Sequence, residues 1–121
     1  MKQNLKQITI SSDTKKFIIN QVHTCSNTDK VLGLMFKSKN KANALLFQFE
    51  KPTKMKIHSF FVFFPFIALW LDDKNQIIEQ RKISPFGFSF SPKRPYNKLI
   101  EIPLNDKYMS LSNAILNNSK P

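Results

Sequence analysis

The side chains of this sequence that could do chemistry are few. His58 begins an apolar run, where a neutral imidazole could act as a general base or ligand, or could bond a loop carbonyl as a structural histidine. His23 and Cys25 are two residues apart, so on a strand they would share a face and could start a metal site with His58. Because no fourth ligand is evident, we predict no metal site, no cofactor and no catalytic set.

The carboxylates give no stronger case for catalysis. Asp72 and Asp73 are adjacent in a segment that predicts a hairpin turn, where neighbouring side chains point apart. Glu101 interrupts an apolar strand, and we expect it to face water or, preferably, to pair with a Lys. With only Gly33 and Gly87 in the chain, a glycine-rich phosphate loop is absent. The sequence therefore leans against an enzyme without deciding the question.

The charge of the chain makes polyanions the first partners to consider. The 121 residues carry a net charge of +11, and 11 Lys against three acidic residues fall within residues 1–56. Only Arg81 and Arg94 offer the planar fork suited to guanine edges, however, and a Lys excess beside many Asn is also what an AT-rich genome produces. The candidates for polyanion binding are Lys37, Lys39, Lys41, Lys54, Lys56, Lys93 and Arg94.

A segment rich in turn residues, 84–96, carries aromatic side chains beside Lys93 and Arg94. Such a composition is typical of platforms for single-stranded nucleic acid, where rings stack on bases and cations follow the phosphates. It equally suits a loop that tucks its rings under the end of a barrel. If the loop closes a pocket, its candidate lining residues are His58, Pro65, Phe86, Phe88 and Tyr96.

Length and composition predict a single domain over residues 1–121, with fraying at 1–5 and 117–121. The apolar fraction of 41% and the 12 Phe indicate a packed core. Cys25 is the only cysteine, and residues 1–7 are not followed by a leader-like apolar stretch, so we expect a cytoplasmic protein. The run over 57–71 is too short to span a bilayer as a helix and is interpreted as buried strand.

The elements expected from periodicity and turn residues are mainly strands. A Ser-x-x-Asp capping box at 26–29 favours one helix, and Asn105 is expected to cap a second. Pro65 marks a bend between two apolar strands, and 51–54 is expected to break the strand before them. We predict strands over 7–10, 17–25, 44–50, 57–64, 66–71, 76–83 and 98–103, and helices over 26–36 and 106–116.

In this order the segments resemble the domain-of-unknown-function 192 family, in its archaeal type. The resemblance rests on Gly33-Leu34-Met35-Phe36-Lys37, on Leu45-Leu46-Phe47, on His58 with the Phe-rich stretch, Pro65, Leu71 and Asp72, and on Ile100-Glu101-Ile102-Pro103. It implies a compact, mainly β domain, α+β by content, of sandwich or barrel type with one or two peripheral helices. It implies no recognised activity, and the motif residues Gly33, Leu34, Met35, Phe36, Pro65 and Asp72 are interpreted as structural.

Two positions depart from the family pattern. The family usually has Asp two residues after the Pro, where this chain has Ile67, and its members tend to close with a further strand containing Gly-Asp. Three functions follow from the sequence. The first is a non-catalytic binding or accessory domain, the second a nucleic-acid-binding accessory protein with a basic face, and the third a small-substrate enzyme with a pocket near His58. Oligomeric state and ligand are not predicted.

Overall fold

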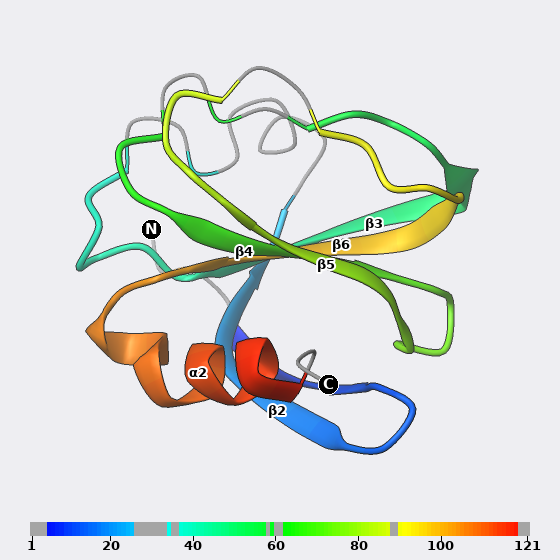
Figure 1. The fold of residues 1–121 in the computed structure, drawn as a ribbon, viewed down its shortest axis with the longest axis horizontal. Coiled ribbons are helices and arrows are strands. Elements are labelled where there is room, and N and C mark those ends of the chain that lie inside the picture. Colours follow the sequence, from blue (N-terminus) through cyan, green and yellow to red (C-terminus); the bar gives the residue numbers. More distant parts are fainter. Residues whose placement is uncertain are drawn as a thin grey trace.

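A computed structural model of the chain describes residues 5–25, 34, 37–57, 59, 62–87 and 90–118. Six strands form one sheet that curls into a half-barrel, and one α-helix of the described residues packs below it (Figure 1). The strands are β1 Leu5–Ser11, β2 Lys16–Thr24, β3 Ala44–Thr53, β4 Phe66–Leu71, β5 Ile77–Ile83 and β6 Tyr96–Pro103. The turn η1, Asp106–Tyr108, leads into α2, Met109–Asn118. The mainly β fold expected from the sequence is confirmed.

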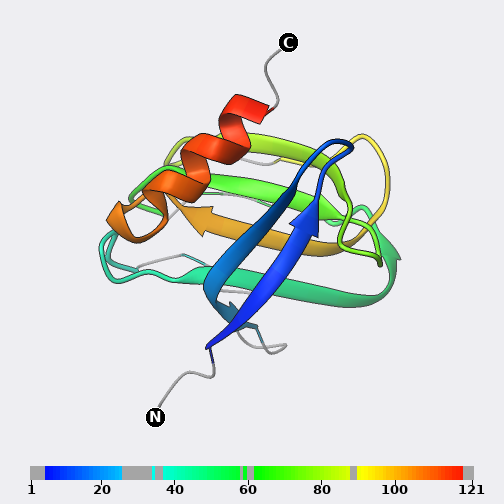
Figure 2. The ribbon, with the colours of Figure 1, turned by 90° about the horizontal axis from the view of Figure 1, so that it is seen from below.

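The strand order in the sheet is β1-β2-β3-β6-β4-β5. Neighbouring strands are antiparallel except β2 and β3, which are parallel over a short stretch from Val22 to Thr24. The β1–β2 hairpin folds across the same face of the sheet as α2, as seen from below in Figure 2. At the tip of the hairpin, the Ser11 amide donates to the Asn75 carbonyl at 3.0 Å. The edge strand β1 is therefore bonded to the turn between β4 and β5.

The two faces of the sheet are covered by different elements. On one face, a core cluster joins buried side chains of β3, β4 and β6 to those of α2 and the β1–β2 hairpin, with Ile19, Leu69 and Ile115 fully buried. On the other face, a second cluster that includes Trp70 and Phe64 is covered by loops, which run above the sheet in Figure 1. Since both faces are covered, β4 is buried at all six positions instead of alternating.

Several predicted boundaries need correction. The described residues of 57–64 do not form the predicted strand. Ile57 makes an isolated bridge with Phe90, the Ser59 amide donates to the Gly87 carbonyl, and the Val62 amide donates back to the Ser59 carbonyl. The expected break at 51–54 is also wrong: β3 continues to Thr53, and Pro52 sits where its ladder with β6 is interrupted, so its missing N–H is not needed. The hairpin turn at 72–75 is confirmed.

Of the two predicted helices, the last one begins differently from the prediction, and the first lies almost entirely outside the described residues. The last helix begins with the 3₁₀ turn η1, and Asn105 makes no side-chain capping bond there. The amide of Asn105 is used elsewhere, as described below. The helix expected over 26–36 lies outside the described residues except for Leu34, which is buried. No helix of the described part is long and apolar enough to cross a membrane.

Candidate functional site

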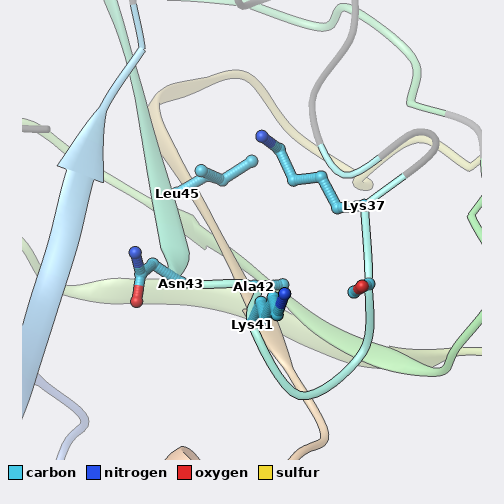
Figure 3. Close-up of a pocket in the computed structure, with 6 residues that line it drawn as sticks. Lys37, Lys41, Ala42, Asn43 and Leu45 are labelled. Carbon is cyan, nitrogen blue, oxygen red and sulfur yellow. The ribbon is translucent and has the colours of Figure 1, made fainter. Parts of the chain in front are cut away.

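A cavity of about 200 Å³ opens between the 37–43 loop and the start of β3. Its apolar floor comes from Leu45, on β3, and from Ala42 just before it. Lys37 extends toward Leu45 across the cavity, and Lys41 lies on the turn of the loop (Figure 3). The cavity is lined by Lys37, Ser38, Lys41, Ala42, Asn43 and Leu45. The site therefore combines two ammonium groups and an amide with a small hydrocarbon surface.

The buried side chain of Asn105 holds the loop that carries these residues. Asn105 follows β6 and is 1% exposed. Its Nδ2 donates to the carbonyls of Lys39 at 2.7 Å and Ala42 at 3.0 Å, which joins residues more than 60 positions apart. A turn closed by the Ala42 amide donating to the Ser38 carbonyl at 3.0 Å fixes the loop internally. The cavity wall is thus anchored to the sheet at a buried point.

The two lysines of the cavity are not neutralised by described groups. Within the described part of the chain, neither Lys37 nor Lys41 forms an ion pair and no acidic side chain lines the cavity. A second cavity of about 230 Å³ lies between β2 and α2, and its one cation, Lys107, already donates from Nζ to Asn43 Oδ1 at 2.6 Å. The first cavity is therefore the better site for an anion.

Glu101 lies in the central strand β6, directly opposite Leu45 of β3 and Ala68 of β4. Residues directly opposite share a face, so Glu101 points into the loop-covered core beside the floor of the cavity. It is 6% exposed, and no described residue donates a hydrogen bond or ion pair to it. Burial raises the pKa of the Glu101 carboxyl from 4.5 to about 8. The expectation that Glu101 faces water or pairs with a Lys is wrong.

Two titratable side chains lie in the same row of the sheet as Glu101, and neither is in an adjacent strand. His23 and Arg81 occupy the same row of the sheet, two strands away on either side. Arg81 pairs with Glu79 at 2.9 Å and stacks over Trp70 with its guanidinium carbon 5.8 Å from the ring centroid. With its pKa raised to about 8, the Glu101 carboxyl is mostly protonated at pH 7 and adds little negative charge beside the cavity.

The seven predicted polyanion-binding residues form two groups. Three of them, Lys37, Lys39 and Lys41, lie before β3. The other four, Lys54, Lys56, Lys93 and Arg94, lie beyond its far end, because the pairing of Thr53 with Tyr96 and of Ile57 with Phe90 runs their segments side by side. At about 3.3 Å per residue, a ten-residue strand separates the groups by roughly 30 Å. The cations do not share one compact face.

The described residues of the predicted pocket, Tyr96, Pro65 and Phe86, differ in burial and in hydrogen-bond partners. Tyr96 is buried and donates from its hydroxyl to the Met55 carbonyl at 2.7 Å, and burial raises its pKa to about 12. The Pro65 carbonyl accepts a bond from the Leu104 amide, while Phe86 is 58% exposed. These three do not line either cavity described above. His58 and Phe88 lie outside the described residues.

The described family-motif residues Leu34 and Asp72 pack in the core and shape a turn, respectively. Leu34 is buried in the loop-covered core, and Asp72 Oδ1 accepts the amides of Lys74 and Gln76 at 2.9 Å to shape the β4–β5 turn. Ile67, which replaces the family Asp, is fully buried in the core cluster below the sheet. Gly33, Met35 and Phe36 lie outside the described residues.

Sequence reasoning missed the contributions of Asn43, Leu45, Asn105 and Glu101. For Glu101 a signal was available, since a strand that is apolar on both sides of a carboxylate indicates a central strand with both faces covered. For Asn105 the sequence offers no signal, because its partners are 63 and 66 residues away.

Together these features define a small, mainly β domain in which a half-barrel sheet carries a basic loop pocket beside the start of its inner strand β3. The chain belongs to the DUF192 family, described as "Uncharacterized ACR, COG1430", whose model it matches over residues 8–106. No curated protein matches the chain.

Two solved structures share the fold. One is a protein of unknown function from Novosphingobium aromaticivorans DSM 12444, with a TM-score of 0.71 and 12% identity over 89% of this chain and 79% of that chain. The other is a putative transcription regulator from Sinorhizobium meliloti 1021, with a TM-score of 0.74 and 12% identity over 93% of this chain and 89% of that chain. At this identity the likeness concerns the fold alone.

Proposed function

We propose that this protein is a non-catalytic binding domain that takes a small anion, a carboxylate or a phosphate, in the cavity between the 37–43 loop and β3. One observation carries the proposal. Lys37 and Lys41 bring two ammonium groups to one cavity, and among the described residues no acid lines this cavity and neither lysine has an ion-pair partner. An anion would supply the missing counter-charge, with charge-assisted hydrogen bonds from the lysines.

The size of the cavity limits the ligand. A volume of about 200 Å³ lies below the range of about 300–1,000 Å³ found for drug-sized ligands. An inorganic ion or a small metabolite with a short carbon chain fits this space. Leu45 and Ala42 would contact the carbon chain, and the Asn43 amide would contact a polar group beside it.

The lining supports binding better than catalysis. Nucleophilic catalysis needs a hydroxyl or thiol with a base in reach. Ser38 is the hydroxyl among the lining residues, and the residues around it in the cavity are two lysines, an amide and apolar groups. Two positive charges beside an apolar floor can hold an anion without changing it chemically.

The other predictions from the sequence stay predictions. Nucleic-acid binding through a single basic face is less well supported, because the seven cations form two separate groups. An enzyme site near His58 falls on a residue outside the description. A cytoplasmic location is supported by the single, buried Cys25, and the archaeal type rests on the motif around Pro65.

Thermal unfolding with added anions tests the proposal. At constant ionic strength, phosphate or succinate at ten times its Kd should stabilise the protein by about 1.4 kcal/mol, which raises Tm by about 4–6 °C. The double variant Lys37→Gln/Lys41→Gln should lose this shift. Lys39→Gln is the matched control, since Lys39 is exposed on the same loop but does not line the cavity. Equal shifts in both variants, or none in the parent protein, would reject the site.

A further inference from the structure

The loops above the sheet expose a group of large apolar side chains that the proposed anion site does not use. Phe63 is 56% exposed, Phe86 58% and Met55 55%, all in the segments that connect β3 to β4 and β5 to β6. The rings of Phe63 and Phe86 contact one another, with centroids 5.8 Å apart and planes at 58°. Exposed apolar groups that gather on one side mark an interaction surface.

The chain holds Phe86 in this exposed position at a conformational cost. Its φ is 62°, in the left-handed region that a bulky residue rarely adopts. The turn is fixed by the fully buried Ser59, whose carbonyl accepts the Phe86 amide at 2.7 Å and whose Oγ accepts the Gly87 amide at 2.6 Å. A Cβ at Gly87 would lie 2.8 Å from Ser59 Oγ, so the turn is also tight. The exposed Phe86 ring is therefore carried by a turn that two hydrogen bonds to Ser59 fix.

Cations flank this apolar group along the same pair of segments. Lys54 and Lys56 bracket Met55, and the antiparallel pairing of Ile57 with Phe90 places Lys93 and Arg94 alongside them. All four cations are exposed. Glu79, which lies beside Lys93, is occupied by Arg81 and by the Lys93 amide at 3.0 Å. Met55 therefore lies among the cations, and Phe63 and Phe86 lie further along the same pair of segments.

We infer that the surface formed by Met55, Phe63, Phe86, Lys54, Lys56, Lys93 and Arg94 binds anionic membrane surfaces peripherally. Peripheral binding adds the burial of apolar side chains at the headgroup boundary to the attraction between cations and anionic lipids. The inference is independent of the small-anion cavity, which lies at the other end of β3.

The same surface fits single-stranded nucleic acid less well. Met55 has no ring on which a base could stack, and Phe63 and Phe86 each cover part of the other. Three of the four cations are Lys, which interact with phosphate as point charges, and only Arg94 offers the planar fork that reads base edges. The net charge of +11 provides the long-range attraction to an anionic bilayer.

Vesicle flotation tests this inference. The full chain should bind vesicles of phosphatidylcholine with phosphatidylserine but not vesicles of phosphatidylcholine alone. In Lys54→Glu/Lys56→Glu, the loss of two positive charges should weaken binding roughly 25-fold, at about fivefold per charge, and the two added negative charges should weaken it further. Phe63→Ser/Phe86→Ser should weaken it roughly tenfold or more per ring. Thermal unfolding of each variant confirms that it is folded.

Two matched controls keep the test specific. Lys15→Glu/Lys16→Glu changes the same charge on the β1–β2 turn, and Ile18→Ser removes an apolar side chain that is 53% exposed on β2. Both should bind vesicles like the parent protein. Absence of vesicle binding, or binding that the Phe variant retains, would overturn the inference. Binding of a labelled 12-nucleotide single strand that the Phe variant loses, without vesicle binding, would assign the surface to nucleic acid instead.

Discussion

Replacement of Glu101 by Gln should change how the stability of the protein depends on pH. Below pH 4.5 the carboxyl is protonated in both the folded and the unfolded chain, so it makes no difference to stability. Between about 4.5 and 8 the unfolded chain releases this proton and the folded chain keeps it, so the free energy of unfolding falls as pH rises. Each pH unit in this window lowers the folding equilibrium constant about tenfold.

The total effect follows from the width of that window. A rise of the carboxyl pKa from 4.5 to about 8 corresponds to a loss of about 5 kcal/mol at pH 9, as an upper value, because water entry and relaxation reduce it. Gln has the shape of the protonated carboxyl and does not ionise. We therefore expect Glu101→Gln to match the parent protein near pH 5 and to exceed its stability by several kcal/mol at pH 9.

Urea unfolding at pH 5, 7 and 9 measures this difference directly. The control is Glu50→Gln, because Glu50 is exposed on β3 and surrounded by water. The stability difference between Glu50→Gln and the parent protein should stay within about 0.5 kcal/mol at all three pH values. A Glu101→Gln difference that is the same at pH 5 and 9 would show that the carboxyl is solvated or paired, and would refute the buried position assigned to it.

Three further predictions concern buried groups. Asn105→Ala should destabilise the protein by about 2 kcal/mol and speed hydrogen exchange in the 37–42 loop, measured by mass spectrometry, because one buried and one part-buried hydrogen bond are lost. Tyr108→Phe should cost about 1–3 kcal/mol in urea unfolding, since the hydroxyl that accepts the buried Ala44 amide at 2.8 Å disappears, and an unchanged stability would mean that this amide finds another partner. Ile67→Asp should cost at least about 4 kcal/mol or prevent folding at pH 7, and a stable variant would show that the position tolerates the family carboxylate.

The sequence predicted the sheet better than the loops that cover it. Local patterns located β4, β5 and the turn between them, because the turn chemistry of Asp72 and Asn75 acts within a few residues. The apolar density of 57–64 was interpreted as a strand, whereas Phe64 and Val62 pack into the core from a loop. Apolar composition reports burial, and it does not say whether the backbone bonds go to a strand or to a loop.

The candidate site was predicted in part. Its charge was visible in the spacing of Lys37 and Lys41, but the cavity depends on the contact of their loop with β3 and on the Asn105 amide, which come from distant parts of the chain. The split of the cations into two groups likewise follows from the length and direction of β3. These are tertiary relations, and local sequence patterns do not contain them.

The most direct test of the central claim is a two-dimensional ¹H–¹⁵N NMR titration of the protein with phosphate and with succinate, against chloride at equal ionic strength. The account predicts saturable shifts of the amide signals of residues 37–45, small changes on β5 and α2, and loss of the response in Lys37→Gln/Lys41→Gln but not in Lys39→Gln. Shifts spread over all exposed lysines without saturation, or a response that the double variant retains, would contradict an anion site in this cavity.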